Sequence, residues 1–136
     1  MIDMGCRKDR YCSDMTRTFF CGEPEPEYAA IHDLVREANE KAEAMIRPGV
    51  RFCDIDRAAR EHIEAGGYGP YFTHRLGHSI GLEDHEFGDV SSVNTDTVKA
   101  GMTFSVEPGV YLPGKFGVRV EDLVLVTEDG HEVLAY

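Results

Sequence analysis

Residues 103–126 read TFSVEPGVYLPGKFGVRVEDLVLV, and the two ends of this stretch decide the fold. Both ends are rich in β-branched and aromatic residues, which predicts strands over 102–108 and 117–127. Acidic residues interrupt both apolar strands: Glu107 in the first, and Glu121, followed by Asp122, in the second. Because an unpaired carboxylate is costly to bury, we expect each glutamate to have a partner inside the fold.

Each glutamate also has a simpler explanation. Glu121 could form an ion pair with Arg119, because residues two apart in a strand share a face. Glu107 could lie on an edge strand, which the following Pro108 favours. Neither explanation says why two strands carry the same feature.

Outward from this stretch, the hydrophobic periodicity predicts both strands and helices. We expect strands at 1–5, 11–21 and 131–135, and helices at 27–46 and 54–65. The segments 68–85 and 89–101, rich in glycine, histidine and polar residues, are expected to be mostly irregular. The order of two strands, two helices and further strands predicts an α+β fold.

Composition narrows the class of protein. At 136 residues the chain is expected to form one domain with a buried core. A formal charge of −11 argues against nucleic acid or an anionic membrane as a partner. There is no secretory signal and no apolar run of roughly 20 residues, and the four cysteines show no paired spacing. We therefore predict free thiols and a cytoplasmic location.

The first two strands each carry an aspartate, Asp3 and Asp14. A hairpin of these strands could bring the two carboxylates together. Aspartate is depleted in strands, so Asp14 in mid-strand requires a partner. A salt bridge from Asp14 to Arg17 is the simpler alternative, and a lone aspartate near a hairpin usually serves the turn.

Three histidines, His74, His78 and His85, fall within twelve residues of a glycine-rich segment. A single histidine there would be expected to pack in the core or face solvent. Three together favour a functional site, because histidine is the commonest metal ligand and the natural acid–base group near neutral pH. The segment lacks the His-Glu-x-x-His helix of zinc proteases.

Asp3, Asp14, His78, Glu107 and Glu121 together offer four carboxylates and one imidazole. Two divalent ions would cancel the four negative charges. Oxygen-rich donors with one nitrogen suit Mn, Co, Zn or Fe(II), and none of the cysteines lies in these motifs. Such a pair of ions is typical of hydrolases.

The short motifs around these donors resemble one family. They are DMG (3–5), SDMTRTF (13–19), GHSIGL (77–82), VEPG (106–109) and RVED (119–122). Together they are similar to the pita-bread (creatinase/aminopeptidase-like) metallopeptidases, which include Xaa-Pro dipeptidase (prolidase), aminopeptidase P and methionine aminopeptidase. The resemblance covers nearly the whole chain. It implies that the five donors hold two divalent ions, Mn or Co first and Zn or Fe as alternatives. Ser79 departs from the family's usual glycine, which would add strain if that position needs a positive φ.

The resemblance is strongest to the proline-directed branch. The two glutamates are only fourteen positions apart, whereas bacterial methionine aminopeptidases usually carry a longer insert there. This implies an exopeptidase that hydrolyses the Xaa-Pro bond of dipeptides or peptide N-termini, so the expected partner is a peptide with proline in second position. Methionine aminopeptidase is the alternative within the family.

The resemblance also implies individual roles. Glu107 would move a proton from the attacking water to the leaving imino nitrogen. His85 would stabilise the oxyanion, and His74 would line the proline side of the site. Arg119 would orient a carboxylate or the substrate terminus, and Tyr111 would do similar work.

The position of Asp3, two residues from the start, suggests that a longer domain precedes it in the family. We therefore expect residues 1–136 to be the C-terminal portion of a catalytic domain, truncated on its N-terminal side. An exposed sheet edge would favour a homodimer or association through that edge. A fragment without activity, or a binding or scaffold module, is the alternative from another functional class.

Overall fold

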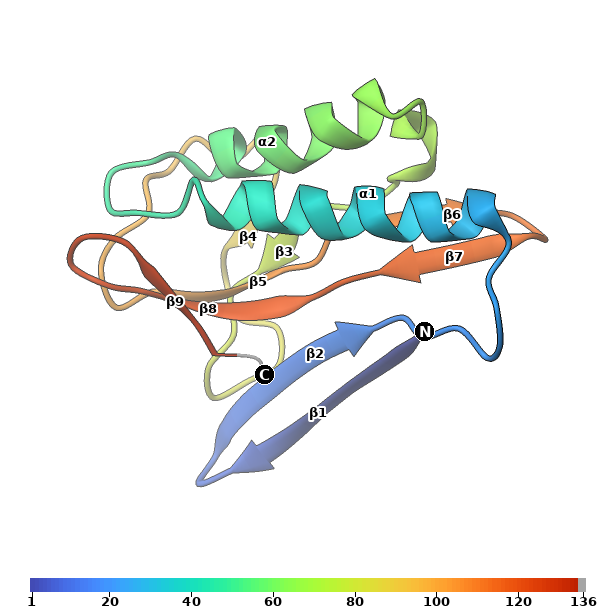
Figure 1. Ribbon diagram of the computed structural model, residues 1–136. Helices are drawn as coiled ribbons and strands as arrows, with labels where there is room; N and C mark the ends of the chain where they lie inside the picture. Colours follow the sequence, from blue (N-terminus) through green and yellow to red (C-terminus); the bar gives the residue numbers. More distant parts are fainter. Residues whose placement is uncertain (135–136) are drawn as a thin grey trace.

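The computed structural model describes residues 1–134, and these form two α-helices, one short 3-10 turn and nine strands. Helices α1 (Pro26–Glu43) and α2 (Phe52–Ala65) pack side by side over one face of the strands (Figure 1). The hairpin of β1 (Ile2–Lys8) and β2 (Tyr11–Arg17) lies on the far side, away from both helices. The α+β class is therefore confirmed.

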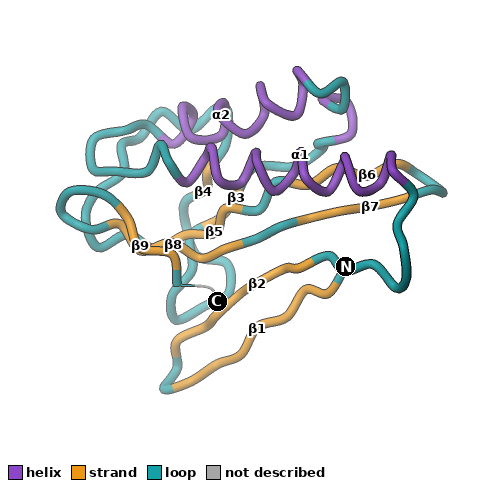
Figure 2. The backbone as a smooth tube through the Cα atoms, viewed as in Figure 1, coloured by secondary structure: helices purple, strands orange, loops and turns teal. Residues whose placement is uncertain are grey.

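Short strands joined by loops form the middle of the molecule (Figure 2). They are β3 (Gly77–His78), β4 (Asp89–Val90), β5 (Thr103–Val106), β6 (Gly109–Leu112), β7 (Phe116–Arg119), β8 (Asp122–Val126) and β9 (His131–Val133), with a 3-10 turn η1 at Gly69–Tyr71. Antiparallel pairing joins β5, β8 and β9 into one sheet, β6 to β7, and β3 to β4.

The β1–β2 hairpin sets which side chains face the middle of the molecule. Its two turn residues, Asp9 and Arg10, have φ of 51° and 75°, as a two-residue turn of type I′ requires. The resulting register places Asp3 opposite Thr16, and Gly5 opposite Asp14. Opposed residues and residues two apart share a face, so Asp3, Asp14 and Thr16 project to the same side.

The core lies between the helices and the strands. Apolar residues at helical spacing on both helices are fully buried. They are Ile31, Val35, Ala38 and Ala42 on α1, with Ile55, Ala59 and Ile63 on α2. The amide of Asn39 on α1 donates to the carbonyl of Val106 at 2.9 Å, which fastens the helix to the end of β5.

The strands around the two glutamates differ from the prediction. The strand expected over 117–127 is two strands, β7 and β8, and Glu121 lies at the break between them. Glu107 directly follows β5. The prediction that both glutamates lie inside strands is therefore wrong, because each lies where regular pairing stops. At the break, the Glu121 amide donates instead to the carbonyl of Thr16 at 3.1 Å.

Other boundaries shift by a few residues. The first strand continues to Lys8, the second ends at Arg17 rather than at residue 21, and α2 begins at Phe52. Strands β3, β4 and β6 were not predicted. The end of the strand predicted over 131–135 falls outside the described residues. Within residues 1–134, neither α1 nor α2 has the length and hydropathy needed to cross a bilayer.

Candidate metal centre

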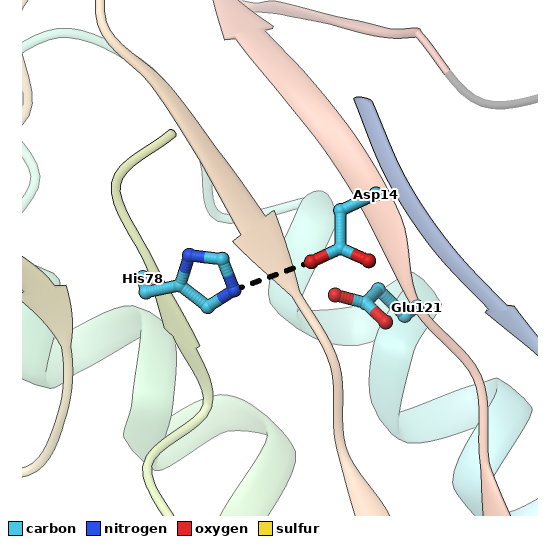
Figure 3. Close-up of side chains that lie close together, drawn as sticks. All are labelled: Asp14, His78 and Glu121. Atoms are coloured by element: carbon cyan, nitrogen blue, oxygen red, sulfur yellow. Dashed lines mark ion pairs between the residues drawn. The ribbon is translucent and has the colours of Figure 1, made fainter. Parts of the chain in front are cut away.

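Three of the five predicted ligands converge between β2, β3 and the β7–β8 break. Asp14, His78 and Glu121 offer donor atoms that all lie within 4.8 Å of one another (Figure 3). The Nε2 atom of His78 is 3.5 Å from Oδ2 of Asp14 and 3.5 Å from Oε1 of Glu107. Carboxylates from three other segments, at Asp14, Glu107 and Glu121, thus lie around the imidazole of His78.

The backbone around His78 fixes the orientation of its ring. Strand β3 approaches β5 so closely that a Cβ on Gly77 would lie 1.9 Å from the carbonyl oxygen of Ser105. The His78 amide donates to Ser105 Oγ at 3.0 Å. Its Nδ1 lies 3.2 Å from the carbonyl of Ser79, which can only accept, so Nδ1 carries the proton. The lone pair of Nε2 therefore faces the carboxylates, as metal binding requires.

The expected strain at Ser79 is absent. Among the non-glycine residues of 1–134, positive φ occurs only at Asp9 and Arg10. Serine in place of the family's glycine is therefore compatible with the backbone here.

Glu121 is the most deeply buried of the four candidate ligand carboxylates, with 1% of its surface exposed. Thr16 donates its hydroxyl hydrogen to Oε2 of Glu121 at 2.6 Å. Burial raises the pKa of Glu121 to about 8; the Thr16 hydrogen bond opposes the rise, and the charges of Glu107 and Asp14 add to it. Without a cation, ionised Glu121 is therefore unfavourable at this position.

The ionised form of Asp14 is disfavoured for the same reasons as that of Glu121. Burial raises the pKa of Asp14, the nearby charges of Asp84 and Asp3 raise it further, and His78 opposes them. Buried carboxylates that repel one another are stabilised by bound cations. The donor set, carboxylate oxygens with one imidazole nitrogen, fits a divalent ion such as Mn, Co, Zn or Fe(II).

Asp3 lies at the edge of this cluster. Its half-exposed carboxylate accepts a hydrogen bond from the Arg119 guanidinium. The same guanidinium has its Nε 3.8 Å from Oε2 of Glu107 and 3.8 Å from Oε2 of Glu121. Arg119 also donates to Thr16 Oγ1, from Nε at 3.1 Å and from Nη2 at 3.0 Å. The Arg119 guanidinium therefore lies close to the half-exposed Asp3 and also to Glu107 and buried Glu121.

The remaining predicted site residues border the centre. The ring of His85 lies 4.0 Å from that of His78, centroid to centroid, and its own Nδ1 is 3.4 Å from Asp84. His74 Nε2 lies 2.9 Å from the hydroxyl of Tyr111. Burial raises the pKa of Tyr111, and the neighbouring Arg119 opposes that rise. The structure therefore brings every predicted site residue to the centre or its border.

The simpler explanations fare differently. Arg17 does not pair with Asp14: its Nη2 donates to Asp122 at 2.5 Å and its Nη1 to the carbonyl of Glu121 at 2.6 Å. The ion pair of Arg119 with Glu121 exists, but Arg119 is shared with Asp3 and Glu107. One positive charge therefore faces several negative ones.

Sequence reasoning missed Thr16, Ser105 and Asp84. Ser105 Oγ donates to Oε1 of Glu107 at 3.0 Å while it accepts from the His78 amide. The signal for two of them was spacing: Thr16 is two residues after Asp14, and Ser105 is two before Glu107. Residues two apart on a strand share a face, so both could have been placed beside the ligands. Asp84 lies in a loop and carried no such signal.

Solved structures share this fold over almost the whole chain. Prolidase from Pyrococcus furiosus matches with a TM-score of 0.97 and 42% identity, over 98% of this chain and 40% of that chain. X-Pro aminopeptidase from Thermotoga maritima matches with a TM-score of 0.96 and 43% identity, over 98% of this chain and 38% of that chain. The fold is thus the pita-bread fold, and with its carboxylate–histidine cluster it defines the class of metallopeptidase catalytic domains.

Within this class, Metallopeptidase family M24 matches residues 1–128, and the chain belongs to that family. A Staphylococcus saprophyticus protein named as an uncharacterized peptidase is 53% identical over 134 residues. That alignment covers 98% of this chain and 38% of the relative's length. The chain therefore spans less than half the length of the relatives it matches.

Proposed function

We propose that this chain is the C-terminal portion of the catalytic domain of a dinuclear exopeptidase that hydrolyses Xaa-Pro bonds in dipeptides or at peptide N-termini. The observation that carries the proposal is the placement of His78 Nε2 at 3.5 Å from both Asp14 and Glu107, with buried Glu121 beside them. The similarity to a prolidase and to an X-Pro aminopeptidase supports the choice of bond.

Asp3, Asp14, His78, Glu107 and Glu121 would hold two divalent ions, Mn or Co first and Zn or Fe as alternatives. Four ionised carboxylates carry a charge that two such ions balance. When bound, the ions would lower the pKa of water and polarise the scissile carbonyl. Arg119 would then be free to leave Asp3 and orient the substrate terminus or a ligand carboxylate.

Glu107 is the residue that would move the proton. Ser105 donates to its Oε1 at 3.0 Å, which helps to hold the carboxylate in place. The other oxygen, Oε2, which faces Arg119 at 3.8 Å, would accept a proton from the attacking water. Glu107 would next deliver that proton to the imino nitrogen of the leaving proline. His85, whose exposed ring lies beside that of His78, would donate a hydrogen bond to the oxyanion, and His74 would line the proline side.

An interaction module is the second candidate, because the hairpin exposes apolar residues that one domain alone leaves uncovered. Ile2 and Met4 on β1 are 49% and 55% exposed. A homodimer or a complementary chain that covers β1 would bury them, since an open strand edge offers unpaired backbone groups. Nucleic acid and anionic membranes fit poorly with the net charge of −11.

The test is hydrolysis of an Xaa-Pro dipeptide by the 136-residue chain loaded with Mn or Co. Glu107→Gln should lower turnover by about 10²- to 10⁴-fold. Glu83→Gln, at an exposed loop position, is the matched control and should retain activity. Cleavage of a longer Xaa-Pro peptide separates aminopeptidase P from dipeptidase activity, and cleavage after an N-terminal methionine indicates methionine aminopeptidase.

The outcomes separate the candidates. Bound metal without turnover of any of these peptides favours the interaction module. Unchanged turnover in Glu107→Gln contradicts the role given to Glu107.

A further inference from the structure

Asp56 and Arg60 form an ion pair on α2, and Arg60 also contacts the segment that carries His74. Asp56 is completely buried, one helical turn before Arg60. The Arg60 guanidinium donates two hydrogen bonds to the Asp56 carboxylate, from Nε to Oδ2 at 2.8 Å and from Nη2 to Oδ1 at 2.9 Å. Arginine can make this planar, bidentate interaction with a carboxylate, and lysine cannot.

Arg60 also holds the irregular segment that carries His74. Its Nη1 donates to the carbonyl of Phe72 at 3.1 Å, and its Nη2 donates to the carbonyl of His74 at 2.9 Å. The guanidinium carbon lies 4.2 Å from the centre of the Phe72 ring, a distance that allows a cation–π contact. The segment belongs to no helix or strand, so these contacts fix its backbone from α2.

The imidazole of His74 connects this segment to Tyr111 on β6. Its Nδ1 lies 2.7 Å from the carbonyl of Arg75, which can only accept, so Nδ1 carries the proton. Its Nε2 then accepts from the Tyr111 hydroxyl at 2.9 Å, and Tyr111 neighbours Arg119. A continuous set of polar contacts thus runs from α2 to the guanidinium that touches the carboxylates.

We propose that Asp56 and Arg60 are positioning residues for His74. The pair fixes the backbone at 72–74 so that the imidazole presents one tautomer, with Nε2 aimed at Tyr111 and the proline side of the site. Stability alone is a weak reason for such a pair, because well-packed apolar residues often replace a buried ion pair without loss. The consequence for catalysis rests on the proposed function, whereas the effect on the His74 ring does not.

The test reads the His74 ring directly by long-range ¹H–¹⁵N NMR of the metal-free chain. In the unmodified protein we expect the Nδ1–H tautomer of His74. Arg60→Lys keeps the positive charge but removes the bidentate hydrogen bonds to Asp56. The ¹⁵N chemical shifts of the His74 ring should therefore move toward the values expected for a mixture of the two tautomers. His131, whose contact is the Ile46 carbonyl, should not change. Arg57→Gln is the matched control, because Arg57 is exposed on the same helix and pairs with Asp54 instead.

Asp56→Asn is the second variant and should move the His74 signals in the same direction. If both variants fold and leave the His74 signals unchanged, the inference is overturned. Loss of folding in both also overturns it, because the pair would then stabilise the whole domain rather than one ring.

In an active chain, Arg60→Lys should raise KM for an Xaa-Pro peptide by up to about 100-fold with a smaller change in kcat. A chain without turnover would contradict the proposed function but leave the NMR result valid.

Discussion

Replacing Glu121 with glutamine should make the metal-free protein more stable at neutral pH. Burial raises the pKa of Glu121 to about 8 from an ordinary value of 4.5. A carboxyl group whose pKa is higher in the folded state binds its proton more tightly there than in the unfolded chain. Its stabilising contribution is therefore complete below pH 4.5 and is lost as the pH rises toward 8. Glutamine stays neutral and still accepts from Thr16, so the loss disappears.

The size of the effect follows from the pKa difference. Each pKa unit corresponds to about 1.4 kcal/mol, so the free energy of unfolding should fall by about 3 kcal/mol between pH 5 and pH 7 because of Glu121. Burial also raises the pKa of Glu43 to about 7, so Glu43 contributes a loss in the same direction. Glu121→Gln should therefore remove the part of the pH dependence of the unfolding free energy that is due to Glu121 and leave the part due to Glu43.

Urea unfolding of the chelator-treated protein at pH 5, 7 and 8 measures this difference. The stability of Glu121→Gln relative to the unmodified protein should rise by about 3 kcal/mol from pH 5 to pH 7. Glu61→Gln, at an exposed position on α2, is the control and should give no such trend. A difference between Glu121→Gln and the unmodified protein that does not vary with pH would refute the reasoning.

Three further substitutions test other parts of the account. Thr16→Val removes the hydroxyl that links Arg119 to the buried carboxylate of Glu121. The free energy of unfolding in urea should fall by about 1–3 kcal/mol, and Mn binding measured by calorimetry should weaken. Unchanged Mn affinity would count against the role given to Thr16. Asn39→Ala leaves the β5 carbonyl that it pairs unsatisfied and should lower stability by about 1–3 kcal/mol, whereas no change would mean that water replaces the amide. Phe104→Ala empties a core site that is 1% exposed and should cost about 3–5 kcal/mol, while Phe87→Ala at a fully exposed site should have almost no effect; equal losses would contradict the core described here.

Local patterns were enough to predict much of this fold. Alternating residues predicted the β1–β2 hairpin, and helical spacing predicted α1 and α2 to within a few residues. The strand over 117–127 was wrong because β-propensity cannot show where pairing partners change. Glu121 lies where the backbone leaves β7 and its amide turns to Thr16, a contact between residues 105 positions apart.

The candidate site was predictable by motif and less so by geometry. Asp14, His78 and Glu107 stood out because their residue types conflict with their surroundings. The sharing of Arg119 among Asp3 and two glutamates depends on long-range packing, which periodicity does not encode. The support of His74 from Arg60 likewise joins a helix to an irregular segment, so only the folded chain reveals it.

The central claim is that Asp3, Asp14, His78, Glu107 and Glu121 hold two divalent ions, and a count of bound metal tests it most directly. Equilibrium dialysis of the chain against Mn, followed by elemental analysis, should find two ions per chain, and fewer in Glu121→Gln. No bound Mn at saturating supply, or an equal count in Glu121→Gln, would contradict the account.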